Sequence, residues 1–219
     1  MSQVILLNKP YGVLTQFTDS VGRPTLKDYV ALSGVYAAGR LDSDSEGLVV
    51  LTDDGGLQAQ IASPRHKMPK IYFAQVENIP QPEALRQMAA GLDLGDFHSQ
   101  PCTVRLVAEP EWLWPRDPPI RYRAAIPTAW LEITLQEGKN RQVRRMTAKI
   151  GHPTLRLIRW AVGPWNLAGL ALGQWRSIKN EEIAAMRQPK STVGVNRPST
   201  RRKPGGTFRK SEYIQGIKK

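Results

Sequence analysis

Two short segments of the 219-residue chain carry side chains that could do chemistry. The first, Gly39–Leu48, holds Asp42 in a glycine-bounded turn shortly after Arg40. The second, Gly138–Met146, lies far downstream and is rich in arginine. Because a guanidinium pairs well with a carboxylate and fixes its rotamer, we expect Arg144 to pair with Asp42 at the floor of a cleft. A carboxylate held in this way can act as a base or as a nucleophile.

Asp42 has two other interpretations. An aspartate in a turn usually hydrogen-bonds its own backbone and has no further role. The spacing also approaches that of an EF-hand calcium loop, whose ligand positions would fall on Asp42, Asp44, Glu46, Gly47 and Asp53. Against calcium, Glu46 is too long for its position, Asp53 is shorter than the usual bidentate glutamate, and Leu48–Leu51 predicts a strand. The single cysteine and three scattered histidines give no other metal-ligand spacing.

The charge balance favours a polyanionic partner. The chain has 31 Lys and Arg against 19 Asp and Glu, a formal net charge of +12, and such an excess is typical of nucleic-acid-binding proteins. Residues 189–219 carry +8 of it, with nine basic residues and one acidic one. No stretch is apolar enough to cross a membrane, and the N-terminus lacks the plan of a signal peptide. We therefore expect a cytoplasmic protein with no membrane association.

The pattern of residues predicts a folded domain over 1–188 and a basic tail over 189–219. The tail has too little apolar surface to offset the entropy of ordering, so we expect it to be disordered. Predicted strands cover residues 4–8, 13–17, 48–52, 70–76, 101–108, 121–136, 155–162 and 170–178. Predicted helices cover 25–30, 53–62, 82–90 and 141–150, with a further short helix capped by Asn180. Because strands and helices do not alternate regularly, we expect an α+β fold with a mixed, mainly antiparallel sheet and flanking helices.

The helix predicted at 141–150 begins with an unfavourable arrangement of charge. Arg141, Arg144 and Arg145 lie in its first turn and a half, where cations oppose the helix dipole. An anion held beside this end of the helix would explain the arrangement. Together with the charge excess, this predicts an enzyme that modifies RNA, and a noncatalytic RNA-binding protein of ribosome assembly is the alternative.

Several motifs, in sequence order, resemble the ribosomal pseudouridine synthases typified by the small-subunit enzyme of bacteria. They are Asn8-Lys9-Pro10-x-Gly12-Val13-Leu14, Gly39–Leu48, Leu51-Thr52-Asp53-Asp54-Gly55, Lys70-x-Tyr72 and Gly138–Met146. The resemblance covers residues 3–180 and implies the pseudouridine synthase fold, with a central active-site cleft and 1–188 as the catalytic domain. Many relatives begin with an RNA-binding module of the S4 type, whereas here the motifs start at residue 4, so no S4 domain is expected.

The resemblance also implies roles for single residues. Asp42 is expected to be the catalytic carboxylate that converts uridine into pseudouridine. Tyr72 is expected against the uracil ring and Leu157 in the pocket wall. Arg144 is expected to pair with Asp42, and Arg40 to help flip the target nucleotide out of its stack. The basic residues expected to bind RNA are Lys9, Lys70, Lys139, Arg141 and Arg145.

No cofactor or metal is implied by the resemblance. The expected partner is ribosomal RNA, above all the large-subunit 23S RNA, and the expected functional unit is a monomer. Because the motifs leave open whether the carboxylate attacks the sugar, attacks the ring or removes a ribose proton, the chemical route stays undecided.

Overall fold

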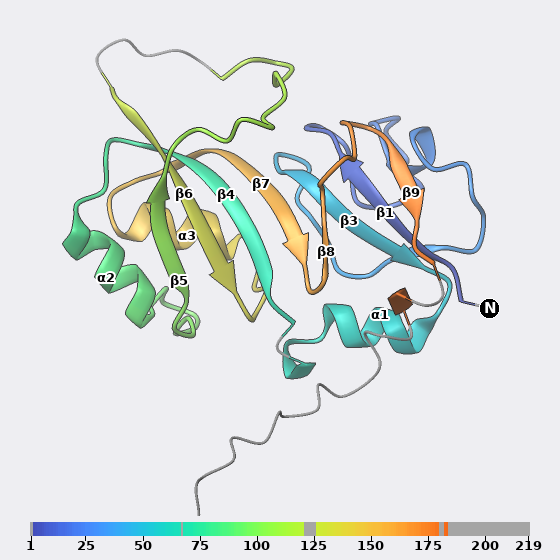
Figure 1. The fold of residues 1–219 in the computed structure, drawn as a ribbon, viewed down its shortest axis with the longest axis horizontal. Coiled ribbons are helices and arrows are strands. Elements are labelled where there is room, and N and C mark those ends of the chain that lie inside the picture. Colours follow the sequence, from blue (N-terminus) through green and yellow to red (C-terminus); the bar gives the residue numbers. More distant parts are fainter. Residues whose placement is uncertain (1, 67, 121–125, 180–181, 184–219) are drawn as a thin grey trace, which may run out of the picture. The chain divides into compact units, whose positions relative to one another are not determined.

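The computed structural model describes residues 2–66, 68–120, 126–179 and 182–183 (Figure 1). Its central sheet has the strand order β5-β6-β4-β7-β3-β1-β9, with β2 paired to β3 and β8 to β7. The strands are β1 (Val4–Lys9), β2 (Tyr36–Ala37), β3 (Glu46–Thr52), β4 (Lys70–Glu77), β5 (Thr103–Val107), β6 (Thr128–Leu135), β7 (Thr154–Val162), β8 (Trp165–Asn166) and β9 (Trp175–Ser177). The helices are α1 (Gly55–Ala62), α2 (Pro82–Ala90) and α3 (Gln142–Lys149), with 3₁₀ turns η1 (Leu26–Asp28) and η2 (Pro64–His66).

The two central strands β1 and β3 are apolar over most of their length because both of their faces are covered. Every residue of both strands is buried. On one face Leu6 packs in a cluster with Leu57 of α1, and on the other Leu7 packs with Leu26 of η1. This double burial explains why neither strand alternates between polar and apolar side chains.

The other half of the sheet supports α2 and α3. In β4 every second residue, including Tyr72 and Ala74, is buried. These side chains pack with Met88 of α2 and with Val143 and Met146 of α3. In Figure 1 the helix α3 lies behind β4, β6 and β7. The packing therefore fixes the start of α3, where the arginines lie, relative to the centre of the sheet.

The two halves of the sheet meet where β3 runs parallel to β7. The other strand pairings of the described residues are antiparallel, and this one joins Glu46 to Ile158 and Gly47 to Arg159. Gly47 has a φ of 103°, and a Cβ built on it would lie 2.4 Å from the carbonyl oxygen of Arg159. Only glycine combines that φ with such a close approach of two backbones.

The predicted α+β fold with a mainly antiparallel sheet is confirmed, as are most of its elements. Those found within a few residues of their predicted bounds are the strands at 4–8, 48–52, 70–76, 101–108 and 155–162 and the helices at 53–62, 82–90 and 141–150. The helix expected at 25–30 is a single 3₁₀ turn, in which the Asp28 carboxylate accepts a hydrogen bond from the Thr25 N–H at 2.8 Å. No helix among the described residues is long and apolar enough to span a membrane.

Two predicted strands are wrong. Residues 13–17 form only an isolated bridge between Leu14 and Thr25, because the chain bends so that the Thr15 hydroxyl can bond the backbone of Leu41. Of residues 170–178 only Trp175–Ser177 is a strand, since Gly173, with a φ of 75°, lies in a turn before it. The strand predicted at 121–136 begins at Thr128, and residues 121–125, Asn180 and the tail 189–219 lie outside the described part of the chain.

Replacing Gly47 tests the junction between the two halves of the sheet. We expect Gly47→Ala to lower the free energy of unfolding by about 2–5 kcal/mol, because the methyl group meets backbone rather than a movable side chain. Gly55→Ala is the control, since this first residue of α1 has nothing within 4 Å of its Cβ position and should change stability by less than about 1 kcal/mol. Urea unfolding measures both, and equal stability of the two variants would refute the close-approach argument.

Candidate active site

A cavity of ≈ 620 Å³ opens between the two halves of the sheet, a size that suits a nucleotide. One wall comes from β4, the end of β6, the loop before α3 and β7, and the other from residues 14–15 and 38–45. Seven of the residues singled out in the sequence line it: Arg40, Asp42, Lys70, Tyr72, Lys139, Arg141 and Leu157. The sequence segments around Asp42 and around Arg141 therefore do meet in one cleft.

The loop that carries Asp42 is fixed through its backbone carbonyl groups. The carbonyl of Asp42 itself accepts from the Ser45 N–H at 3.1 Å, and that of Ser43 accepts from the Gly12 N–H at 2.7 Å. The Asp44 carbonyl accepts from Nη2 of Arg144 at 2.6 Å. Because these carbonyls are all hydrogen-bonded, the backbone of the loop has little freedom to change conformation. The Cα–Cβ bond of Asp42 therefore points in a fixed direction.

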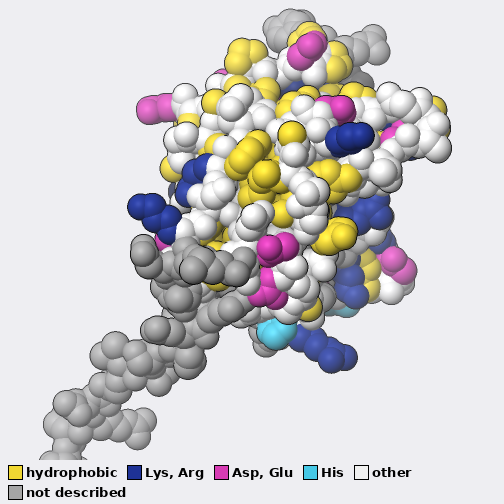
Figure 2. Space-filling model, turned by 90° about the vertical axis from the view of Figure 1, so that its right-hand side faces the viewer, with side chains coloured by type: hydrophobic (Ala, Val, Ile, Leu, Met, Phe, Trp, Pro, Cys, Tyr) yellow, Lys and Arg dark blue, Asp and Glu magenta, His cyan; other side chains and the backbone are white. Residues whose placement is uncertain are grey.

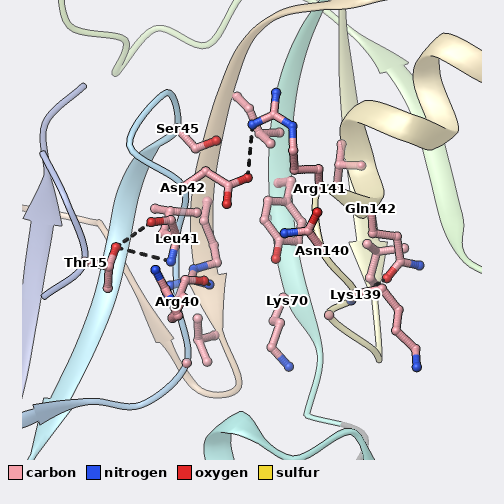
Figure 3. Close-up of a pocket in the computed structure, with 18 of the residues that line it drawn as sticks. Thr15, Arg40, Leu41, Asp42, Ser45, Lys70, Lys139, Asn140, Arg141 and Gln142 are labelled. Carbon is pink, nitrogen blue, oxygen red and sulfur yellow. Dashed lines mark hydrogen bonds and ion pairs between the residues drawn. The ribbon is translucent and has the colours of Figure 1, made fainter. Parts of the chain in front are cut away.

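The same loop is held by two residues that sequence reasoning missed. The buried guanidinium of Arg159 donates to the carbonyl of Arg40 at 3.2 Å and to that of Leu48 at 2.8 Å. The buried Thr15 hydroxyl donates to the Leu41 carbonyl and accepts from the Leu41 N–H (Figure 3). A charged residue inside the apolar run of β7 was a signal for Arg159, whereas a single threonine in a predicted strand gave none for Thr15.

The guanidinium within ion-pair distance of Asp42 belongs to Arg141, not to Arg144 as expected. Nη1 of Arg141 lies 3.6 Å from Oδ2 of Asp42, and Figure 3 shows the two side chains pointing toward each other. Arg144 instead lies with Nε 3.5 Å from Oδ2 of Asp44 and donates to the carbonyls of Asp44 and Thr154. Arg144 therefore fixes the loop, and Arg141 provides the positive charge at the carboxylate.

Asp44 supplies the anion that the start of α3 requires. Arg141 binds its carboxylate with two hydrogen bonds of 3.2 and 3.0 Å. Burial alone would raise the pKa of Asp44, but the hydrogen bonds from Arg141 and the charge of Arg144 outweigh it and lower the pKa. The cations in the first turn of α3 are thus compensated by a carboxylate from the loop that carries Asp42, which offsets their unfavourable interaction with the helix dipole.

Tyr72 and Leu157 both line the cavity and form an apolar part of its wall, while the contact of Tyr72 with a uracil ring stays a prediction. Their exposed fractions are 8% and 5%, and they lie on the adjacent strands β4 and β7. The ring of Tyr72 and the aliphatic side chain of Leu157 line the same cavity as the carboxylate of Asp42. Together they give an apolar surface against which a pyrimidine can lie.

The basic residues expected to bind RNA differ in their accessibility. Lys70 and Lys139 line the cavity, and in Figure 3 both side chains extend away from Asp42. Lys70 is nevertheless not open for the RNA contact we expected: it is 7% exposed, and its Nζ donates to the Met68 carbonyl at 3.1 Å. Burial, followed by the charge of Arg159, lowers the pKa of Lys70. Arg145 lies outside the cavity lining, where it pairs with Asp96 and lies 4.9 Å from the centre of the Phe97 ring.

Lys9 does not bind RNA from the surface as we expected, because it is completely buried. Its Nζ donates to the carbonyls of Pro10 and Val13, both at 2.8 Å. Burial lowers the pKa of Lys9 to about 7, and the charge of Glu46 offsets only part of this shift. Lys9 therefore stabilises the turn at residues 10–13, which directly precedes Leu14 and Thr15 of the cavity wall.

The calcium alternative fails because its ligand positions diverge. Glu46 and Asp53 are separated by the extended strand β3. The Glu46 carboxylate binds Arg156 at 2.8 Å, and Asp53 accepts from the N–H of Gln3 at the other end of that strand. The described residues contain no group of three or more His, Cys, Asp and Glu that could hold a metal ion.

Residues 3–149 match the family model of the RNA pseudouridylate synthases. The chain belongs to this family. It is 53% identical over 177 residues to the ribosomal large subunit pseudouridine synthase E of Vibrio parahaemolyticus, which covers 81% of this chain and 74% of the relative. It is 55% identical over 170 residues to the protein of the same name from Xanthomonas axonopodis pv. citri, covering 77% and 90%. A crystal structure of a pseudouridylate synthase superposes with a TM-score of 0.70 at 26% identity, covering 84% and 73%.

The family membership confirms the fold and the enzyme class that the motifs implied. The sheet described above is the pseudouridine synthase fold, and the chain is an RNA pseudouridine synthase. The roles of individual residues in this synthase stay predictions, which the following variants address.

Thr15 offers a test of the loop that carries Asp42. Thr15→Val removes the hydroxyl at nearly constant volume and leaves a buried carbonyl without a partner, so we expect a loss of about 1–3 kcal/mol of stability and a slower turnover. Thr15→Ser keeps the hydroxyl and should retain the turnover rate despite a small loss of packing. Urea unfolding and single-turnover rates measure the two effects, and a serine variant as slow as the valine variant would contradict the role of the hydroxyl.

Lys9 should make the stability of the synthase depend on pH. Its pKa is about 7 in the folded protein and about 10.4 in the unfolded chain, so between these values the unfolded state binds more protons. The stability of the wild type relative to Lys9→Met is therefore lowest below pH 7 and rises above it, by up to about 1.4 kcal/mol per pH unit.

Urea unfolding of both proteins from pH 6 to 9.5 measures this difference. Lys149→Met, at an exposed position of α3, reports the effect of removing a solvated amine. A wild-type advantage that stays constant or falls as the pH rises would contradict the burial of a lysine with a lowered pKa.

Proposed function

We propose that this synthase converts a uridine of large-subunit ribosomal RNA into pseudouridine, with Asp42 as the catalytic carboxylate. The names of the two relatives above support the choice of RNA. The observation that carries the proposal for Asp42 is its position: a carboxylate with 38% of its side chain exposed in a nucleotide-sized cavity, 3.6 Å from the guanidinium of Arg141.

The proposed reaction replaces the N1–C1′ bond between base and ribose with a C5–C1′ bond. The N1–C1′ glycosidic bond breaks, the ring turns, C5 joins C1′, and the proton lost from C5 is balanced by the one gained at N1. Asp42 begins the reaction as an anion, whether it acts as a nucleophile or as a base. The guanidinium of Arg141 stabilises that anion, and the fixed carbonyls of the loop hold it in one orientation.

Because the glycosidic bond of a stacked base is inaccessible, the target uridine enters the cavity flipped out of its helix or loop, at a cost of a few kcal/mol. Its ring lies against Tyr72 and Leu157, which are apolar and buried. Arg40, exposed at the cavity rim, replaces contacts that the flipped nucleotide leaves behind, and Lys139 lies near its phosphates.

We also propose how the rest of the chain contributes. Residues 1–188 form the catalytic domain and the basic segment 189–219 adds nonspecific attraction to RNA, which weakens as the salt concentration rises. The functional unit we propose is a monomer. A ribosomal RNA substrate locates the reaction in the cytoplasm.

Asp42→Asn tests the proposal. Because an amide can neither attack nor accept the proton, we expect turnover to fall by at least about a thousandfold, while RNA affinity stays within about twofold. The measurement is tritium release from RNA labelled at C5 of uridine, together with a binding titration. Asp93→Asn is the control, an exposed aspartate that accepts from the N–H of Gly95 and lies outside the cavity lining, and it should keep full turnover.

If Asp42→Asn retained turnover, Asp42 would not be the catalytic group. The noncatalytic alternative makes the opposite prediction, since a protein acting only by RNA binding would keep its function in Asp42→Asn and lose it on deletion of 189–219. Mapping pseudouridines in ribosomal RNA from cells with and without this synthase identifies the modified nucleotide.

A further inference from the structure

The connection between β5 and β6 is much longer than the sheet requires. The two strands are antiparallel neighbours, yet β5 ends at Val107 and β6 begins at Thr128. A hairpin needs about two to five residues, and a connection above about 12–15 residues without regular structure is usually either functional or a disordered linker. The structure describes residues 108–120 and 126–127 of this connection, and the reaction outlined above assigns them no role.

Residues 108–120, the β5–β6 arm, are anchored to the element that follows the catalytic loop. Nε1 of Trp114 donates to Oε1 of Glu46 at 2.7 Å, and Nη2 of Arg156 donates to the Trp114 carbonyl at 2.9 Å. Trp112 stacks on Trp160, with 4.2 Å between ring centres. Because Glu46 is the first residue of β3 and follows Asp42 by four positions, the arm is held in a defined position relative to the catalytic loop.

The β5–β6 arm carries Arg116, whose guanidinium has no carboxylate partner among the described residues. Arg116 lies 4.3 Å above the ring of Tyr11, its Nε donates to the Pro118 carbonyl at 2.8 Å, and its Nη1 lies 3.4 Å from the Leu155 carbonyl. No carboxylate of the described residues lies within ion-pair distance of Arg116, a property that it shares with several other arginines. Nη2 of Arg116 makes no hydrogen bond within the described part of the chain, and the residue as a whole is partly exposed.

The position of Arg116 follows from its neighbours. Tyr11 precedes Gly12, whose N–H binds the carbonyl of Ser43, and Ser43 lines the cavity. Arg144, which binds the Asp44 carbonyl, also binds the carbonyl of Thr154, and Arg116 lies next to the carbonyl of the following residue, Leu155. Arg116 and Arg144 therefore lie on the same side of the catalytic loop. A partly exposed cation that is held by a ring and two carbonyls, and whose remaining amino group has no acceptor among the described residues, is suited to bind a phosphate.

We propose that Arg116, stacked on Tyr11, binds a backbone phosphate of the substrate RNA beside the flipped nucleotide, so that the β5–β6 arm is an RNA-binding element. This inference rests on the proposed function for the presence of RNA. It assigns a contact on the Ser43 side of the cavity, separate from Arg40, Lys70 and Lys139 in the lining.

The test is the salt dependence of RNA binding by Arg116→Gln. The probe is an unmodified transcript of bacterial large-subunit ribosomal RNA, and binding is measured at several salt concentrations in the Asp42→Asn background, so that no product forms. Loss of one phosphate contact should raise Kd on the order of tenfold and reduce the slope of log K against log salt by about 0.7–0.9.

Two further variants separate charge from structure. Arg105→Gln is the matched control, an exposed arginine on β5 paired with Glu132, and it should leave Kd and slope unchanged. Arg116→Lys keeps the charge, so its slope should return to nearly the wild-type value even though the planar stack on Tyr11 is lost. Near-ultraviolet circular dichroism reports whether the tryptophans of the arm keep their packing in each variant.

The outcomes distinguish this inference from the proposed function. Arg116→Gln binding like Arg105→Gln, with normal turnover in the presence of Asp42, would overturn the phosphate contact and leave the enzyme assignment intact. A changed slope in Arg116→Gln that Arg116→Lys fails to restore would make the effect structural and also overturn it. Failure of the wild-type protein to bind the transcript would overturn both.

Discussion

The structure around the cavity depends on the backbone of the loop that carries Asp42. The carbonyls of residues 40 to 44 are all occupied, by Arg159, the Thr15 hydroxyl, the Ser45 N–H, the Gly12 N–H and Arg144. These donors come from separate parts of the chain, which include β7, α3 and the turn after β1. Because each carbonyl has its own donor, moving the loop would leave several polar groups unpaired at once. The carboxylate of Asp42 is therefore held as rigidly as a residue of the sheet, although it lies on a turn.

The arrangement of charge follows from the same loop. Asp42 and Asp44 lie two positions apart, and both face Arg141, but their environments differ. Asp44 is bound by two hydrogen bonds from Arg141, whereas the one contact that the carboxylate of Asp42 makes with a cation of the described residues is the longer one of 3.6 Å. A carboxylate that is fully hydrogen-bonded has few lone pairs left for chemistry, while one that is stabilised from a distance keeps them. Two neighbouring aspartates can thus take separate roles, with one holding the helix and the other facing the cavity.

Much of the fold could be predicted from the sequence because local patterns decided it. The alternation of β4 and the helix that Pro82 begins both reflect periodicity and capping, which act within a few residues. The motifs also brought Asp42 and the arginines of α3 together correctly. The failures were tertiary. The pattern of residues 13–17 predicts a strand, but the chain bends there so that Thr15 can bond the loop that carries Asp42. Nothing in the local sequence distinguishes Thr15 from a threonine in a strand.

The same limit applies to which arginine reaches Asp42. Arg141 and Arg144 are three positions apart, and residues with that spacing share a face in a helix, so periodicity alone cannot choose between them. The choice depends on the backbone of Arg141, which precedes α3 with a φ of 48°, so that its guanidinium reaches both aspartates. Glycine often marks a left-handed backbone conformation in a sequence, but an arginine in that conformation has no such signature. The prediction therefore chose Arg144, three positions after the residue that pairs with Asp42.

Burial also explains why the net charge of +12 is a poor guide to the RNA-binding surface. Lys9, Arg156 and Arg159 are each less than 5% exposed, and their donors are used by carbonyls or, for Arg156, by Glu46 as well. Figure 2 shows a face of the molecule on which Lys and Arg are scattered among acidic side chains around an apolar centre. Cations that bind protein acceptors contribute rigidity, and only those with donors left open can bind phosphates. The specific contacts to RNA must therefore come from a few fixed, open guanidinium and ammonium groups around the cavity rather than from the overall excess of positive charge.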